Sequence, residues 1–244
     1  MRFRFRISES AITLVCGEEY LETAKNAVRE SRSVIEEKIG SDPFFRVTYD
    51  PYPENPADDD LIRRMCRASE SAGVGPMAGV AGAVAVYTAE KVREAGAGIV
   101  IVENGGDIAF FSEEPVPVVI YADDGVFKNI GFLMRSDRIT GVCSSSARIG
   151  PSVSLGSSDL CTVFSDDVIL ADCCATTLGN MVRSPADLEK SVEKTGSVKG
   201  VRGCMAVCGG KVAMFGDIPE MIPADCSGIP GPYRSHLFRS GSPD

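Results

Sequence analysis

Hairpin patterns constrain the fold of this chain more than any other feature. Residues 98–111 read GIVIVENGGDIAFF, in which two apolar runs flank the four residues NGGD, Asn104 to Asp107. Paired glycines between apolar runs favour a tight turn, so this segment predicts an antiparallel hairpin. Residues 2–16 and 203–216 also read as pairs of strands joined by short turns. Because strands arrive in hairpins with few strand–helix–strand crossovers, we predict an α+β fold with a mainly antiparallel sheet and packed helices.

The remaining elements follow from apolar periodicity. Residues 77–95 are nearly all apolar and predict a central helix, buried against the sheet. Further helices are predicted at 18–40, 58–73, 166–180 (with Asp166 or Asp167 as its cap) and 185–195. Further strands are predicted at 44–53, 116–122, 129–135, 139–145 and 159–165. No linker divides these elements, so we predict one domain over residues 1–221, followed by an irregular tail over 222–244 that is rich in Pro, Gly and Ser.

Charge and hydropathy restrict the partners and the location. The chain has 34 acidic residues against 25 Lys and Arg, a net charge of −9. This balance argues against nucleic acid or an anionic membrane as the main partner, and it leaves room for a small anionic ligand. The longest low-polarity run, residues 77–87, is far shorter than the roughly 20 residues of a membrane helix. With no signal-type apolar region near residue 1, we expect a cytoplasmic protein.

Two further features concern assembly and redox state. Residues 2–7, RFRFRI, are predicted to form an edge strand, and its unpaired backbone favours a homodimer. The nine cysteines are scattered, odd in number and without a CxxC pair, which indicates reduced thiols used as small buried hydrophobes.

Residues 170–180, LADCCATTLGN, place a carboxylate and a hydroxyl four residues apart on a predicted helix. At this spacing Asp172 and Thr176 share one helix face. Together with the main-chain carbonyl of Ala175 they offer the oxygen ligands that Mg²⁺ prefers. The structural alternative is an acid near the start of a helix, with threonines that bond back to the preceding turn.

Two other segments have the composition of a binding site. The glycines of NGGD let a backbone loop approach a ligand, and Asp107 offers an acceptor for a ribose or a ring, although the segment is also a good hairpin turn. Residues 141–159, GVCSSSARIGPSVSLGSSD, hold seven serines, whose hydroxyl and backbone N–H groups suit an anion. The alternative for this serine loop is an exposed connection.

NGGDI, then GVCSSS, then ADxxAT occur in an order that resembles the ApbE family of flavin transferases, and in particular a short cytosolic branch of it. The resemblance runs from about Pro76 to Asn180. It implies an ApbE-like, T-fold-like architecture whose pocket holds a flavin dinucleotide (FAD or FMN) with Mg²⁺ beside the pyrophosphate. It assigns metal binding to Asp172, Thr176, Ala175 and Ala81. It places Asn104, Gly105, Gly106, Asp107, Ser144 and Ser145 beside the cofactor.

The same comparison shows where the chain departs from the family pattern. The family's GxAKG motif resembles residues 79–83, but Gly82 replaces the lysine. The family's His and its DPxTG segment have no counterpart after the serine loop, and His236 is the only histidine. One hypothesis is therefore a Mg-dependent enzyme with FMN-transferase-like or FAD-handling activity. The alternatives are a non-catalytic protein that binds a flavin or another anionic metabolite, and an accessory factor in anaerobic sulfur or amino-acid metabolism.

Overall fold

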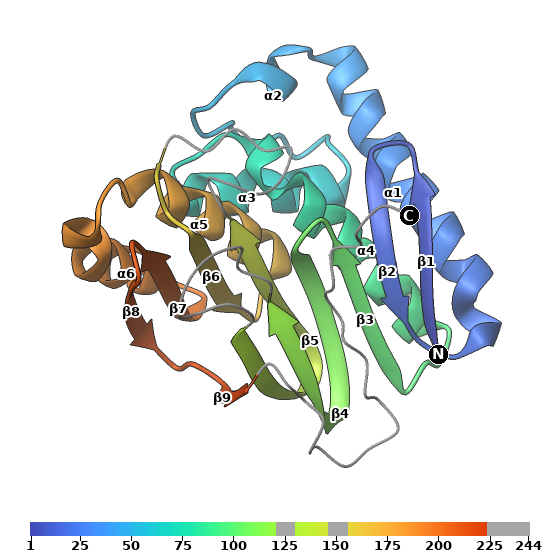
Figure 1. Ribbon diagram of the computed structural model, residues 1–244. Helices are drawn as coiled ribbons and strands as arrows, with labels where there is room; N and C mark the ends of the chain where they lie inside the picture. The colour runs from blue at the N-terminus through green and yellow to red at the C-terminus, as the bar shows by residue number, and fades with distance from the viewer. Residues whose placement is uncertain (121–129, 146–155, 224–244) are drawn as a thin grey trace, which may run out of the picture.

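The structure is a computed structural model that describes residues 1–120, 130–145 and 156–223 (Figure 1). Its strands are β1 (Arg2–Ile7), β2 (Ser10–Val15), β3 (Ile99–Asn104), β4 (Asp107–Ile120), β5 (Ile130–Ser145), β6 (Leu160–Ser165), β7 (Val201–Cys208), β8 (Lys211–Gly216) and β9 (Glu220–Pro223). Its helices are η1 (Glu18–Tyr20), α1 (Leu21–Ser41), α2 (Phe44–Val47), α3 (Asp60–Ala72), η2 (Pro76–Gly79), α4 (Val80–Glu94), α5 (Val168–Met181), η4 (Pro185–Asp187) and α6 (Leu188–Gly196). The α+β class predicted from the hairpins is confirmed.

The described strands form one sheet in the order β1 to β8, and every neighbouring pair is antiparallel. Short turns join β1 to β2, β3 to β4 and β7 to β8, whereas helices lie between β2 and β3 and between β6 and β7. β9 departs from the order and pairs with the first part of β5. Ile222 and Pro223 therefore lie in a strand, whereas the predicted tail from residue 224 onward lies outside the described residues.

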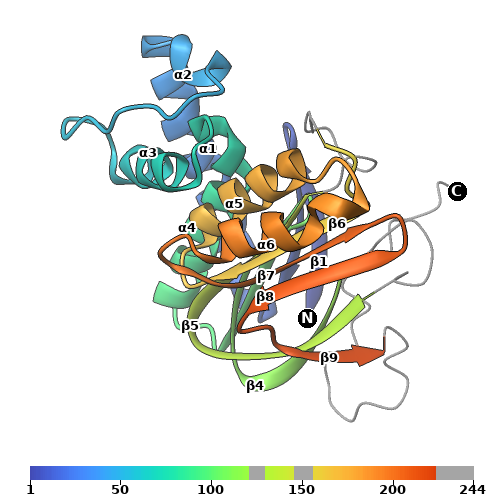
Figure 2. The ribbon, with the colours of Figure 1, turned by 90° about the vertical axis from the view of Figure 1, so that its left-hand side faces the viewer.

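β4 and β5 are long strands that bend without breaking. Separate strands were predicted at 116–122, 129–135 and 139–145, but the described parts of these segments belong to β4 and β5. Irregularities in the pairing fall between Phe110 and Val116 of β4. The hydroxyls of Ser112 and Ser136 each donate to the carbonyl two residues ahead, at 2.8 and 2.7 Å. Such bulges increase strand twist locally, and the two strands curve in Figure 2.

The helices cover one face of the sheet in two layers. Figure 2 shows α4, α5 and α6 next to the strands, with α2 and α3 farther out. α4 contacts β3 and β4, α5 contacts β5 and β6, and α6 contacts β7. α1 packs on α4, and α3 packs on α5. Helix α4 confirms the predicted buried helix, because its alanines and valines are enclosed between α1 and the sheet.

Both faces of the inner strands, such as β3 and β6, are buried, which explains why a run such as IVIV is continuously apolar. Val100 and Val102 of β3 face the core beneath the helices, whereas Ile101 lies in a second core on the opposite face. Phe110, Phe132 and Phe164 also belong to this second core, where Phe132 and Phe164 meet edge to face at 5.1 Å.

The strand predicted at 44–53 is wrong. Residues Phe44–Val47 form α2, and the amide of Phe44 donates to Asp42 Oδ1 at 3.1 Å. Phe45 alone is buried, against the ring of Tyr52, while Phe44 is exposed. Pro43, with φ −61°, starts the short helix, so this local chemistry prevails over the β-propensity of FFRV.

Two other findings concern the cysteines and the helices as a set. The eight cysteines in the described part of the chain are buried and form no disulfide with one another, and Cys204 and Cys208 lie on β7. No single helix among the described residues has the length and apolarity to span a membrane. Helix Asp60–Ala72 and the helical segment Pro76–Glu94 meet at a bend of 108°. Taken together they are long and apolar enough for a membrane span, by length and composition only.

Candidate functional site

The register of three strands places Asn104, Asp107 and Cys143 in one row across the sheet. Asn104 opposes Asp107 across the β3–β4 hairpin, and Asp107 opposes Cys143 on β5. Directly opposed residues project from the same face of a sheet. For this row it is the helix-covered face, because Cys143 belongs to the core beneath the helices. The turn between Asn104 and Asp107 contains Gly105 and Gly106 alone, with φ of 69° and 109°, as the sequence predicted.

The first turn of α4 lies against this row on the helix-covered face of the sheet. The side-chain amide of Asn104 donates to the carbonyl oxygen of Ala81 at 3.2 Å. The next amide along, that of Gly82, donates to Oδ2 of Asp172 at 2.8 Å. The hairpin turn, α4 and α5 therefore meet around these two hydrogen bonds.

Small residues allow α5 to lie close to both α4 and the sheet. A Cβ on Gly82 would stand 2.9 Å from the Val168 carbonyl oxygen and 3.2 Å from Asp172 Oδ2. A Cβ on Gly141 of β5 would stand 2.8 Å from Val168 Cα. The lysine of the related family motif therefore has no room at position 82 in this packing.

The N-terminus of α5 is capped by Asp167, whose Oδ1 accepts from the amides of Ile169 and Leu170 at 2.9 and 3.1 Å. Asp167, one of the two predicted capping acids, thus satisfies the first turn of the helix. Asp172 lies further along α5 and is not the capping acid. Its carboxylate instead contacts α4, through the Gly82 amide, and Asp107 of the β3–β4 hairpin.

Asp107 and Asp172 form a buried pair of carboxyl groups. They are only 8% and 6% exposed, and they lie within hydrogen-bonding reach of each other. Burial raises the pKa of Asp172 to about 7, against the lowering effect of the Gly82 amide. Burial, and then the charge of Asp172, raises the pKa of Asp107 well above its ordinary range. Two carboxyls this close and this buried cannot both ionise readily, so ionisation of one opposes ionisation of the other.

Cys143 lies beside the carboxyl pair, whereas Glu103 lies near Asp107 on the opposite face of the sheet. The Cys143 thiol lies beside Asp107 and also donates to the Val168 carbonyl at 3.5 Å. Burial, followed by the charges of Asp107 and Asp172, raises the pKa of this thiol well above its usual range, so it stays protonated. Glu103 accepts from the Gly106 amide at 3.2 Å, and burial raises the pKa of its carboxyl. The sequence analysis did not single out Cys143, because its position depends on the register of β5.

The other predicted site residues have varied positions. Thr176 is half-buried, one turn beyond Asp172 on α5, and Ala175 is buried. Thr177 has a structural role instead, because its hydroxyl lies 2.8 Å from the Ala72 carbonyl and 3.1 Å from that of Cys173. Its contact with Ala72 joins α5 to α3.

The serine loop is only partly described. The hydroxyl of Ser144 pairs with that of Thr162 at 3.0 Å, on the opposite face of the sheet from Asp107. The main-chain amide of Ser144 lies beside the Asp107 carboxyl. By strand alternation, Ser145 shares the helix-covered face with Cys143. Residues 146–155, which include Pro151, lie outside the described residues, and so does His236.

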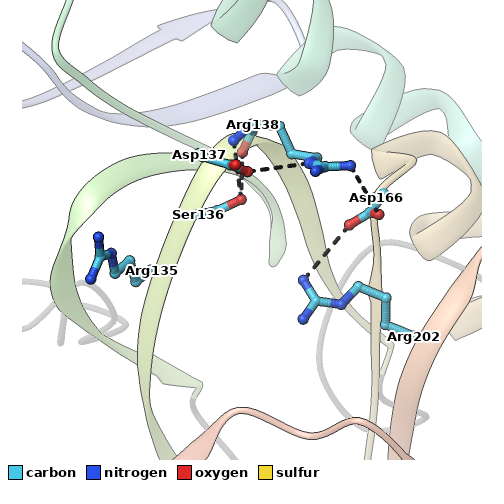
Figure 3. A pocket seen from close by; sticks show the side chains of 6 residues that line it. All are labelled: Arg135, Ser136, Asp137, Arg138, Asp166 and Arg202. Atoms are coloured by element: carbon cyan, nitrogen blue, oxygen red, sulfur yellow. Dashed lines mark hydrogen bonds and ion pairs between the residues drawn. The ribbon is translucent and has the colours of Figure 1, made fainter.

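A cavity of about 480 Å³ lies elsewhere, beside the bend of β5. It is lined by Arg135, Ser136, Asp137, Arg138, Asp166 and Arg202 (Figure 3). Asp166 lies between two guanidinium groups, 3.8 Å from Arg138 and 3.7 Å from Arg202. Arg202 also pairs with Asp217 at 2.7 Å. The opposite charges of these solvent-exposed ion pairs largely cancel. The cavity contains none of the site residues predicted from the sequence.

Solved structures share this fold. The flavinyl transferase ApbE of Pseudomonas stutzeri, in its apo form, matches 88% of this chain and 93% of its own, with a TM-score of 0.57 and 14% identity. The flavin transferase ApbE of Vibrio cholerae matches 88% of this chain and 96% of its own, with a TM-score of 0.54 and 12% identity. The architecture is thus that of the ApbE flavin transferases.

Sequence comparison identifies the family. The family model described as "AbpE bacteria" matches residues 2–211, and the chain therefore belongs to this ApbE-like family. It is 42% identical to a UPF0280 protein of Methanocella arvoryzae over 91% of both chains. It is 38% identical to a UPF0280 protein of Archaeoglobus fulgidus over 92% of this chain and 95% of the relative.

Proposed function

We propose that this protein binds a flavin nucleotide with the help of Mg²⁺ at the junction of the NGGD turn, α4 and α5. The observation that carries the proposal is the position of Asp172. Its carboxyl is buried, accepts the Gly82 amide at 2.8 Å, and has no Lys or Arg partner among the described residues. Membership of the ApbE-like family and the fold support a flavin as the ligand.

The donors around Asp172 suit a hard cation. The Asp172 carboxylate, the Thr176 hydroxyl and the carbonyls of Ala81 and Ala175 are all oxygen ligands, which Mg²⁺ prefers. Within the described residues, no three His, Cys, Asp or Glu side chains lie close enough together to hold a metal. A cation here would therefore depend on main-chain and hydroxyl oxygens as well as on carboxylate. When bound, Mg²⁺ would supply positive charge beside a pyrophosphate.

The chain's own residues would position the ligand. The backbone of Gly105 and Gly106 carries no side chain and permits a flavin or adenosine to approach the turn. The amide of Asn104 holds the Ala81 carbonyl, and so sets the direction of that oxygen. The main-chain amide of Ser144 and the side chain of Ser145, which share the helix-covered side with Asp107, would border the phosphates. With these groups in place, the activity we propose is FMN-transferase-like transfer or another form of FAD handling.

A second candidate is flavin or anionic-metabolite binding without transfer. It is favoured by the close contact at Gly82, which leaves no space for the lysine of the related motif. A protein without that lysine would keep the other groups of the proposed site and lack one of the family's charged groups. Incubation of the full chain with FAD and Mg²⁺, followed by mass spectrometry, separates the two candidates. FMN and AMP as products, or a covalently flavinylated acceptor, support the enzyme, whereas intact bound FAD supports the carrier.

The proposal as a whole is tested by the variant Asp172→Ala. We expect Mg²⁺-dependent FAD binding, measured by calorimetry, to be lost while the melting temperature stays nearly the same. Asp166→Ala is the matched control, because it removes a carboxylate from the arginine-lined cavity. Unchanged FAD binding together with a large loss of stability would show that Asp172 is structural.

A further inference from the structure

We infer that Asp107 is a second carboxylate ligand of the cation, so that Asp107 and Asp172 form a two-carboxylate site that binds a divalent ion without nucleotide. This inference rests on the proposed function and deepens it. The sequence suggested that Asp107 contacts a ribose or a ring. The structure assigns it to the same small site as Asp172.

Asp107 begins β4 on the sheet, whereas Asp172 lies on α5, and the two carboxyls approach each other from opposite sides of the interface. Asp107 lies beside the Cys143 thiol and the Ser144 amide, yet its Oδ1 is buried and has no hydrogen bond of normal geometry. An unsatisfied buried acceptor costs free energy unless something binds to it. Oδ1 is therefore an open ligand position.

No Lys or Arg in the described part of the chain forms an ion pair with Asp107 or Asp172. The position where the related motif has a lysine is closed by the contact of Gly82 with Val168 and Asp172. Buried carboxylates are normally paired with a cation or coordinate a metal. A divalent ion would balance two carboxylates without any side chain of opposite charge.

Asp107 is 8% exposed, and Asp172 is equally enclosed, so neither carboxyl presents an open edge to a ribose or a flavin ring. A single ion has the size to reach both. The Ala81 carbonyl lies at the same junction, because Asn104 holds it and Gly82 follows it. Oxygen ligands of this kind favour Mg²⁺ or Mn²⁺ over softer metals.

The test measures Mn²⁺ binding to the full chain in the absence of nucleotide, by titration calorimetry and electron paramagnetic resonance. We expect Asp107→Asn and Asp172→Asn each to weaken Mn²⁺ binding on the order of tenfold or more. Asp166→Asn, which removes the same charge from the arginine-lined cavity, should leave the dissociation constant unchanged. Because asparagine resembles a protonated aspartate, these variants should keep the fold, and circular dichroism checks this.

The outcomes separate this inference from the proposed function. Loss of Mn²⁺ binding in Asp172→Asn with wild-type binding in Asp107→Asn overturns the role of Asp107 and leaves the proposed function standing. A wild-type chain that binds no Mn²⁺ without nucleotide also overturns the two-carboxylate site, while Mg²⁺-dependent FAD binding is judged separately. An equal loss in Asp166→Asn shows a general charge effect and overturns the inference. If Asp107→Asn does not fold, Asp107→Glu replaces it and should alter the preference between Mg²⁺ and Mn²⁺.

Discussion

Asn104 holds the main-chain carbonyl of Ala81 through a 3.2 Å hydrogen bond, and this contact joins the NGGD turn to the start of α4. The bond spans 23 residues of sequence and connects the sheet with the helical layer. It also aims a carbonyl oxygen beside the amide that contacts Asp172. The turn is therefore part of the site as well as a connection between strands.

Asn104→Ala removes this bond and leaves the Ala81 carbonyl without its side-chain donor. We expect a loss of about 1–2 kcal/mol in the free energy of unfolding, measured by urea denaturation. We also expect weaker Mn²⁺ binding, because the carbonyl is no longer held in place. Asn26→Ala is the control, since Asn26 is exposed on α1 and bonds only to Arg29 there. Equal stability of the two variants would contradict the structural role of Asn104.

Gly82→Ala tests the close contact between α4 and α5. Alanine has a helix propensity about 1 kcal/mol better than glycine, so propensity alone predicts a more stable protein. The new Cβ would meet the Val168 carbonyl at 2.9 Å, and we expect the clash to prevail with a net loss of about 1–3 kcal/mol. In Gly40→Ala on α1, no atom lies within 4 Å of the new Cβ, and stability should rise. A Gly82→Ala variant that gains stability as Gly40→Ala does would refute the contact.

The carboxyl pair predicts the pH dependence of the metal-free protein. Asp172 has a pKa of about 7 in the folded chain against 3.8 for an unperturbed aspartate, so the folded state binds more protons than the unfolded state between these values. Stability supplied by this group is therefore present at low pH and is lost as pH rises from about 4 to 7. Denaturation in chelator across this range should show a steeper decline for the wild type than for Asp172→Asn. The opposite order would contradict the raised pKa.

Added Mn²⁺ should weaken this pH dependence, because an ion that binds the ionised carboxylates stabilises the folded state most where they are deprotonated. The measurement repeats the same denaturation series with saturating Mn²⁺ in place of chelator. A decline with pH that is the same in both series would argue against a cation at this pair.

The exposed edge of β1 predicts a homodimer. Among the described strands, β1 ends the order at one side of the sheet, and none of them pairs with its outer edge. Arg4 and Arg6 are exposed along it, so two copies would bring like charges together. We expect light scattering to detect a dimer at micromolar concentration that becomes stronger with salt, because salt screens the arginines. A monomer at every salt concentration would remove this prediction.

Local chemistry made much of the fold predictable from the sequence. Gly105 and Gly106 adopt positive φ because glycine lacks the Cβ that opposes it, and the hairpin follows from these two residues. Asp167 caps α5 because a short acidic side chain reaches the first free amides of its own helix. The helix at 44–47 was missed because Pro43 and Asp42 outweighed the strand propensity of the phenylalanines.

The candidate site itself was predictable only in part. The spacing of Asp172 and Thr176 on one helix is a local property, and so is the glycine turn that ends in Asp107. The contact between Asp172 and Asp107 is not a local property. Asp172 finds its amide donor 90 residues away, at Gly82, and Asp107 reaches the pair through the register of β3, β4 and β5. Register and helix packing minimise the free energy of the whole core, and a one-residue slip would turn Asp107 and Cys143 to the other face of the sheet. For that reason, the sequence determined which groups are available, and the tertiary structure alone decided that two carboxyls share one buried position.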